Sequence, residues 1–98
     1  MKTVYIAGPM TGLPGYNYPA FNAAANQLRQ QGFSVENPAE SEPPACGTWE
    51  GWMRLGIEKL IRCQALVLLP GWRESRGARI EHHLAIDLGL EILAWGNE

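Results

Sequence analysis

The fold is decided by the stretch ALVLLPGWRESRGARIEHHLA, residues 65–85. It begins with a continuous apolar run of strand length, which is typical of a central parallel strand covered on both faces. A Pro-Gly turn and a polar loop follow, and the small residues after Ser75 indicate the start of a helix. Counted from Glu81 at helical spacing, positions 77, 78, 84, 85 and 88 are all apolar or small, so one carboxylate shares the stripe that faces the core. Such a group is rarely buried without a partner or a function, and Glu81 is therefore the first candidate for chemistry.

Strand and helix patterns alternate on both sides of this stretch. The sequence predicts strands over residues 3–8, 33–37, 65–71 and 90–95, and helices over 19–32, 49–62 with Thr48 as N-cap, and from Ser75 to a terminator at Gly89. This alternation favours an α/β fold: one small, open parallel sheet of about four strands with helices on both faces, a flavodoxin- or Rossmann-like arrangement of three layers. A chain of this length predicts a single domain over residues 1–98.

Composition excludes several classes of partner. The chain is 46% apolar and only 18% charged, and its formal net charge is -2. No broad basic field is present, so we expect neither a nucleic acid polymer nor a membrane surface as partner. We find no signal peptide and no apolar run of spanning length, and we expect a cytoplasmic protein. The low charge fraction is compatible with a homodimer or higher homo-oligomer, in which the tryptophan-bearing helix contributes to the interface.

The cysteines and histidines form no metal-binding pattern. Cys46 and Cys63 could pair in one disulfide, but Cys63 lies in an apolar stretch and is better interpreted as a reduced core thiol. His82 and His83 are adjacent and point about 100° apart on a helix, so they cannot easily share one metal ion. We therefore expect no metal and no cofactor.

Ligands on parallel sheets bind beyond the carboxyl ends of the strands. Three loops are expected at that edge, over residues 8–17, 37–40 and 70–78. Glu81 follows the third loop by one to two helical turns, so the fold brings this carboxylate near the ligand edge. The first loop matches neither a Walker A motif nor a dinucleotide fingerprint.

Two interpretations stay open for the residues at the start of the third helix. Ser75, Gly77 and Ala78 would expose main-chain N–H groups that attract a phosphate or carboxylate. Alternatively, Ser75 is only an N-cap and Gly77 only a packing residue. Trp72 could stack on a nucleobase or sugar, or pack against a neighbouring loop.

The remaining candidates also have two interpretations. Glu81 is either catalytic or a buried carboxylate paired with one of the nearby arginines, which are Arg54, Arg76 and Arg79. Trp49 and Trp52 are better interpreted as core or interface anchors than as ligand contacts.

Two segments resemble a known family. The segments YIAGPMTG (residues 5–12) and LLPGWRESRGARIEHHLA (68–85) resemble small bacterial and phage proteins of the DUF4406 family. These are relatives of the nucleoside 2-deoxyribosyltransferase and deoxynucleoside-monophosphate N-glycosidase superfamily. The resemblance covers nearly the whole chain and implies a nucleoside or nucleotide as ligand.

The same resemblance assigns roles to residues. It implies that Glu81 is the nucleophile that attacks the anomeric carbon and displaces the base. Ser75 and nearby main-chain N–H groups, which Gly77 and Ala78 supply here, would bind the sugar or its 5′-phosphate. The first loop would close over base and sugar, around Tyr5, Gly8, Pro9 and Met10. Relatives are commonly dimers or larger, with neighbouring subunits completing each site.

The chain departs from the superfamily at two acidic positions. Gly56 stands where an aspartate is usual, and Gln64 stands where a second acidic residue is frequent. Two hypotheses follow: an enzyme that cleaves or transfers the N-glycosidic bond, or a catalytically degenerate module that binds a nucleotide without turnover. If the missing carboxylate limits the rate, Gly56→Asp should raise base release.

Overall fold

The computed structural model describes residues 2–41, 44 and 47–96. The α-helices and strands in chain order are β1 (Thr3–Ala7), α1 (Tyr18–Gln30), β2 (Ser34–Glu36), α2 (Trp49–Leu60), β3 (Ala65–Leu68), α3 (Arg76–Asp87) and β4 (Glu91–Ala94). Short 3-10 turns precede or follow them: η1 (Pro14–Asn17), η2 (Pro38–Glu40) and η3 (Trp72–Glu74). The predicted alternation of strands and helices is confirmed.

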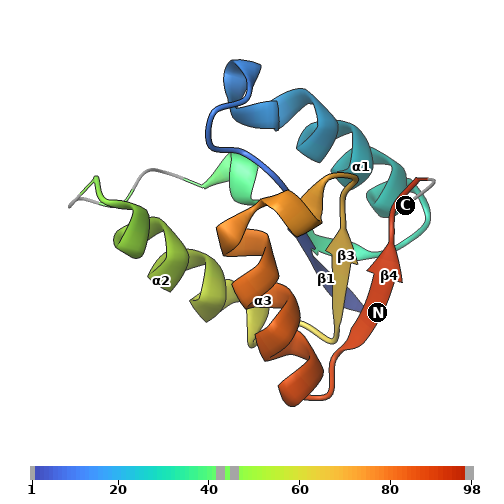
Figure 1. Ribbon diagram of the computed structural model, residues 1–98. Coiled ribbons are helices and arrows are strands. Elements are labelled where there is room, and N and C mark those ends of the chain that lie inside the picture. Colours follow the sequence, from blue (N-terminus) through green and yellow to red (C-terminus); the bar gives the residue numbers. More distant parts are fainter. Residues whose placement is uncertain (1, 42–43, 45–46, 97–98) are drawn as a thin grey trace.

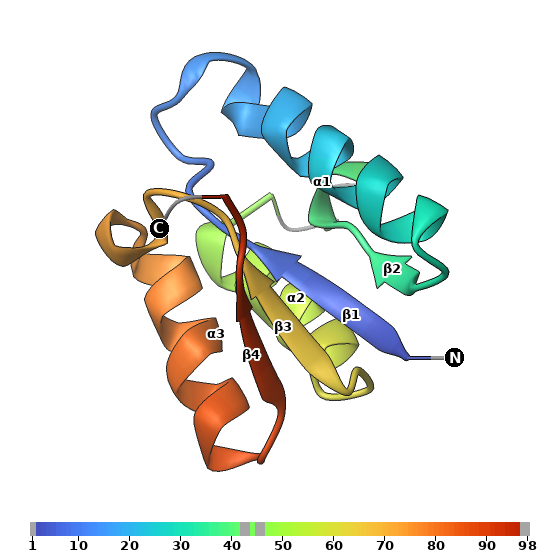
Figure 2. The same ribbon diagram turned by 90° about the vertical axis from the view of Figure 1, so that its right-hand side faces the viewer.

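The four strands form one parallel sheet in the order β2-β1-β3-β4. Figure 2 shows the arrows pointing the same way, with α1 on one side of the sheet and α3 on the other. β3 is buried along its whole length in the centre of the sheet, as its apolar sequence predicts. The predicted α/β class and the three-layer arrangement are thus confirmed.

Local sequence signals set the helix ends. The Thr48 side chain accepts a hydrogen bond from the Gly51 amide at 3.0 Å and caps α2, and the Ser75 side chain accepts one from the Ala78 amide at 3.2 Å and caps α3. Each cap satisfies an amide that has no partner inside its helix. At the other end of α3, Gly89 has φ +78°, a left-handed conformation that glycine adopts at low cost.

The two faces of the sheet carry two separate cores. Alternate side chains of β1 point to opposite faces, so Val4 and Ile6 join the α1 core while Tyr5 and Ala7 join the core beneath α2 and α3. Figure 1 shows α1 on one side of the strands and both α2 and α3 on the other. Glu81 belongs to α3 and is buried on the second face.

Two further predictions concern cysteine and the membrane. Cys63 is a free, buried thiol, as predicted, and burial raises its pKa to about 11. Cys46, and with it the disulfide alternative, lies outside the described residues. None of the described helices combines the length and the apolar character that crossing a membrane requires.

Candidate functional site

A cavity of about 800 Å³ opens at the carboxyl edge of the sheet. The first loop, the start of η2, one face of α2 and the first turns of α3 enclose it. Eight of the nine site residues predicted from the sequence line this cavity: Tyr5, Gly8, Pro9, Met10, Ser75, Gly77, Ala78 and Glu81. The parallel topology therefore brings together residues that are far apart in the sequence.

Trp72 is the exception. Its side chain is only 8% exposed, belongs to the core beneath α3 and does not line the cavity. The indole ring packs against His82, with ring centroids 4.4 Å apart, and the Arg73 guanidinium lies 4.8 Å from the centroid of the Trp72 ring. Burying this large ring against α3 removes its apolar surface from water. The expected stacking of Trp72 on a ligand is corrected to a packing role.

The centre of the site is a buried pair formed by Glu81 and Tyr5. Glu81 is 7% exposed and Tyr5 is 2% exposed. The Tyr5 hydroxyl donates a hydrogen bond of 2.8 Å to Oε2 of Glu81. Within the described part of the chain, Oε1 of Glu81 accepts no hydrogen bond, although no side-chain oxygen or nitrogen there is both fully buried and unbonded. Oε1 is therefore open to the cavity.

The nearby arginines do not neutralise Glu81. Arg76 stacks on Trp49, with its guanidinium 4.2 Å from the ring centroid, and Arg79 donates to the main-chain oxygen of Arg73 at 2.8 Å. No salt bridge joins Glu81 to an arginine among the residues that the structure describes. The ion-pair interpretation of Glu81 is thus wrong for this structure, and the carboxylate has a tyrosine as its partner instead.

This buried environment raises the pKa values of both Glu81 and Tyr5. Burial raises the pKa of the Glu81 carboxyl to about 7, although the Tyr5 hydrogen bond acts in the lowering direction. Burial, with the charge of Glu81 as a smaller cause, raises the pKa of the Tyr5 phenol well above its usual range. Tyr5 consequently remains a proton donor at neutral pH while Glu81 exchanges its proton there, which suits a carboxylate that reacts.

Gly56 lies directly against this pair. A Cβ at position 56 would stand 2.6 Å from the Tyr5 hydroxyl oxygen and 2.9 Å from Oε2 of Glu81. Any side chain there must displace a buried tyrosine or the carboxylate itself. The expectation that Gly56→Asp raises base release is revised accordingly: the position has no room for an added carboxylate while the pair keeps its present geometry.

A second close approach joins α2 to α3. A Cβ at Gly77 would stand 2.9 Å from the Met53 sulfur, so Gly77 allows α3 to pack closely against α2. Ser75 is the N-cap of α3 and also lines the cavity. The amides of Arg76 and Gly77 come next; the first amides of a helix have no intrahelical partner and carry the positive end of the dipole. The cap and the anion-binding interpretations are therefore compatible.

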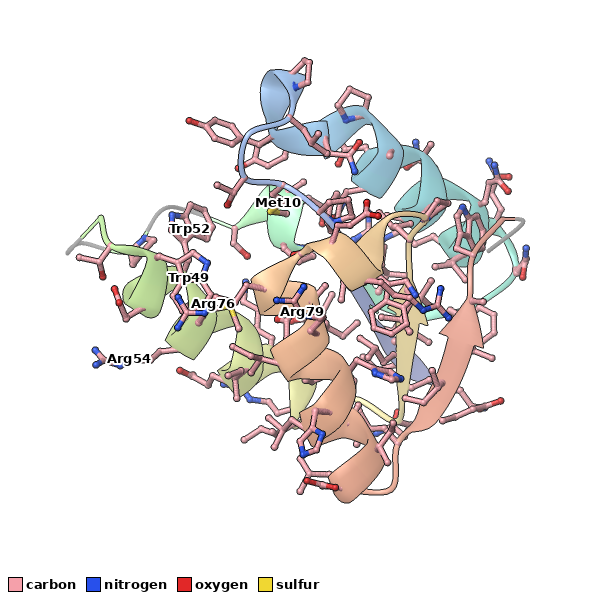
Figure 3. The ribbon with its side chains drawn as sticks, viewed as in Figure 1. Met10, Trp49, Trp52, Arg54, Arg76 and Arg79 are labelled. Carbon is pink, nitrogen blue, oxygen red and sulfur yellow. The ribbon has the colours of Figure 1, made fainter. Side chains whose placement is uncertain are left out.

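Several cavity residues were missed by the sequence analysis. Trp49 and Trp52 are half-buried residues on the cavity wall, rather than members of either core cluster. Figure 3 shows their side chains near Arg76, with Met10 of the first loop nearby, while Arg54 extends outward from α2. The signal was the spacing of Trp49, Trp52 and Gly56, which places all three on one side of the helix.

Gln64 lies at the other edge of the sheet. It precedes β3, and its side-chain oxygen accepts a hydrogen bond from the Thr3 amide at 2.8 Å. It does not line the cavity. The Gln64 side chain therefore connects the starts of β1 and β3 and is not part of the site.

The chain has both a family match and a structural relative. Among solved structures it is similar to a 2-desoxiribosyltransferase from Leishmania mexicana, with a TM-score of 0.74 and 19% sequence identity. The similarity covers all of this chain but only 66% of that one, and at this identity it shows a shared fold. No curated protein matches the chain. The family model described as "Domain of unknown function (DUF4406)" matches residues 2–94, and the chain therefore belongs to the DUF4406 family.

Proposed function

We propose that this protein cleaves or transfers the N-glycosidic bond of a nucleoside or nucleotide, with Glu81 as the nucleophile. One observation carries the proposal: Glu81 is buried at a cavity, has no cationic partner among the described residues, and keeps Oε1 open to that cavity. A buried carboxylate without a cationic partner lowers the stability of the fold, and groups of this kind are found mainly at functional sites. The fold shared with a 2-desoxiribosyltransferase supports the same class of ligand.

The reaction would proceed through a covalent intermediate. The Glu81 carboxylate attacks the anomeric carbon, the bond to the base nitrogen breaks, and a glycosyl ester forms on Glu81, as in retaining glycoside hydrolysis. Water or a second base then attacks the same carbon and releases the carboxylate. The Tyr5 hydroxyl fixes Oε2 through its hydrogen bond, so that Oε1 is the attacking atom.

The start of α3 suits a 5′-phosphate. The first amides of the helix and the Arg76 guanidinium both present positive charge to the cavity next to Ser75. A 5′-phosphate should therefore improve affinity over the free nucleoside, and isothermal titration of a matched pair measures this. In Ser75→Ala the loss of binding free energy should be about 1–2 kcal/mol.

We further propose that the protein works as a homodimer or higher homo-oligomer. Exposed apolar side chains support this proposal: Ile80 and Ile86 in α3, and Ile61 and Leu88 directly after α2 and α3. Sedimentation at micromolar concentration tests it, and a monomer would contradict it.

Base release is the direct test of the proposed activity. Purine and pyrimidine nucleosides and their 5′-monophosphates, with ribose and with 2-deoxyribose, are incubated with wild type and with Glu81→Gln. We expect at least one compound to lose its base with wild type only. Release by both proteins would remove Glu81 from the mechanism.

One observation favours a second candidate, a nucleotide-binding module without turnover. Gly56 supplies no carboxyl group beside Glu81, whereas an aspartate is usual there in the superfamily that the chain resembles. Thermal shift with the same compounds separates the candidates. Stabilisation by a nucleotide without base release from any compound would support the binding module.

A further inference from the structure

One face of α2 lies along the cavity. Trp49, Met53, Gly56 and Lys59 all line it, at spacings of three or four residues. At a rise of about 1.5 Å per residue, Gly56 lies about 10 Å along the helix from Trp49, and Lys59 lies about 4.5 Å further. The face therefore marks three successive places along the cavity.

Each place has its own contact. Trp49 lies beneath the Arg76 guanidinium at the start of α3. Gly56 lies against the reactive pair of Tyr5 and Glu81. A phosphate at the Arg76 end and an anomeric carbon at Glu81 leave the third place, around Lys59, for the base.

Lys59 is anchored at this third place. Its Nζ donates to the Ser41 hydroxyl, just after η2, and both residues line the cavity. An ammonium group has three N–H donors, so the contact with Ser41 leaves others for a ligand. Among the described residues that line the cavity, the other cation is Arg76, and the second carboxylate, Glu74, is exposed in η3 beside Ser75. Lys59 is thus the charged side chain on the base side of Glu81.

We propose that Lys59 binds the departing nucleobase and gives it a proton, an inference that rests on the proposed function. As Glu81 forms its bond to the anomeric carbon, the electron pair of the breaking carbon–nitrogen bond moves into the base, and one ammonium proton of Lys59 passes to a nitrogen or oxygen of that base. The neutral amine then takes a proton from the water whose oxygen attacks the glycosyl ester. Lys59 thereby supplies the acid that position 56 lacks.

Two groups of nucleotides with the same sugar and phosphate separate this role from a structural one. The first group is the 5′-monophosphates of 2′-deoxyguanosine and 2′-deoxycytidine. The second is the same nucleotides methylated at guanine N7 or cytosine N3, whose cationic bases leave without receiving a proton. Base release from each is measured with wild type, Lys59→Met and Lys59→Arg. Lys2→Met, at an exposed lysine paired with Glu91, is the matched control.

We expect Lys59→Met to lower kcat on the unmethylated nucleotide by about 10²–10⁴-fold, the usual value of general acid catalysis. On the methylated nucleotide the loss should be less than about threefold, because no proton is required. Lys59→Arg keeps the charge, but a guanidinium does not release a proton at neutral pH, so KM should recover while kcat stays low. Lys2→Met should match wild type on both.

An equal loss on both substrates would overturn the proton-donating role of Lys59 and leave the proposed function intact. Unchanged kcat in Lys59→Met on the unmethylated nucleotide would overturn it as well. If wild type releases the base from none of these nucleotides, the proposed function fails for them and this inference fails with it.

Discussion

The two faces of the sheet use the same strand for different purposes. On the α1 face, Val4 and Ile6 of β1 pack with Phe21 and Leu28 in an apolar core. On the other face, the intervening Tyr5 meets a buried carboxylate at the wall of a cavity. Each large apolar side chain buried on the first face stabilises the fold by about 1.5–3 kcal/mol.

The second face carries a cost instead. Raising the pKa of Glu81 from 4.5 to about 7 corresponds to roughly 3 kcal/mol against the ionised form. The apolar core on the α1 face therefore offsets the free-energy cost of burying Glu81 on the other face. Changes on the first face should affect folding, and changes on the second should affect chemistry.

The largest expected effect is that of Glu81→Gln. Base release should fall at least about a thousandfold, since the proposed nucleophile is lost. The same variant should gain stability at pH 8, by up to about 3 kcal/mol, because a neutral amide replaces a buried charge. The direction follows from the raised pKa of Glu81. Below pH 4.5 Glu81 is protonated in both folded and unfolded wild type, so it does not lower the free energy of unfolding. As pH rises through about 7, wild type loses stability because the unfolded state ionises more readily than the folded state.

Urea unfolding of wild type and Glu81→Gln at pH 4 and pH 8 measures that stability difference. Similar stability at pH 4 and a gain at pH 8 would sharpen the contrast between the faces. A variant that is less stable than wild type at pH 8 would mean that Glu81 stabilises the fold.

Leu28→Ala tests the opposite face. Leu28 is buried in the α1 core and does not line the cavity. The change should lower the free energy of unfolding by about 2–5 kcal/mol. Turnover per folded molecule, measured at low temperature, should equal that of wild type. A kcat loss larger than the unfolded fraction would break the proposed separation of the faces.

Gly56→Ala probes the close packing around the reactive pair. Alanine favours a helix over glycine by about 1 kcal/mol, but its Cβ would push Tyr5 and Glu81 apart. Displacing the Glu81 carboxylate from its position at the cavity should reduce kcat/KM about tenfold to a hundredfold. Gly77→Ala is a matched control, since its Cβ meets the flexible Met53 side chain, and its effect should be smaller. Equal effects of the two substitutions would mean that the contact of position 56 with Tyr5 and Glu81 has no particular importance for activity.

Tyr5→Phe should produce the smallest change, visible chiefly in the pH profile. The Tyr5 hydrogen bond lowers the pKa of Glu81, so removing it should raise that pKa. The rise of kcat/KM with pH, which follows ionisation of Glu81, should therefore shift toward higher pH, with little change at its upper plateau. Profiles from pH 5 to pH 9 measure this. A uniform loss at every pH would assign Tyr5 a role in positioning alone.

Much of this architecture is visible in the sequence because its signals are local. The apolar run at residues 65–68 predicts a central strand, and Thr48 and Ser75 are side chains that cap helices. The small and apolar residues around Glu81 predict its burial, since helical periodicity alone places it on the inner stripe.

The parts that sequence did not predict depend on long-range packing. The bond between Tyr5 and Glu81 joins residues 76 positions apart and needs the register of β1 beside β3. The contact of Gly56 with that pair arises only where α2 crosses α3. The helical periodicity of Trp49 and Trp52 is compatible with both a core and a cavity wall. Trp72 packs inward against His82, a contact that local sequence does not show.

The covalent state of Glu81 during turnover tests the central claim most directly. Wild type is mixed with a nucleotide whose base it releases, quenched in acid within the turnover time, digested and analysed by mass spectrometry. We predict a peptide carrying one glycosyl group on Glu81, and no such peptide from Glu81→Gln. Base release by wild type with Glu81 unmodified, or with the glycosyl group on another residue, would contradict the account.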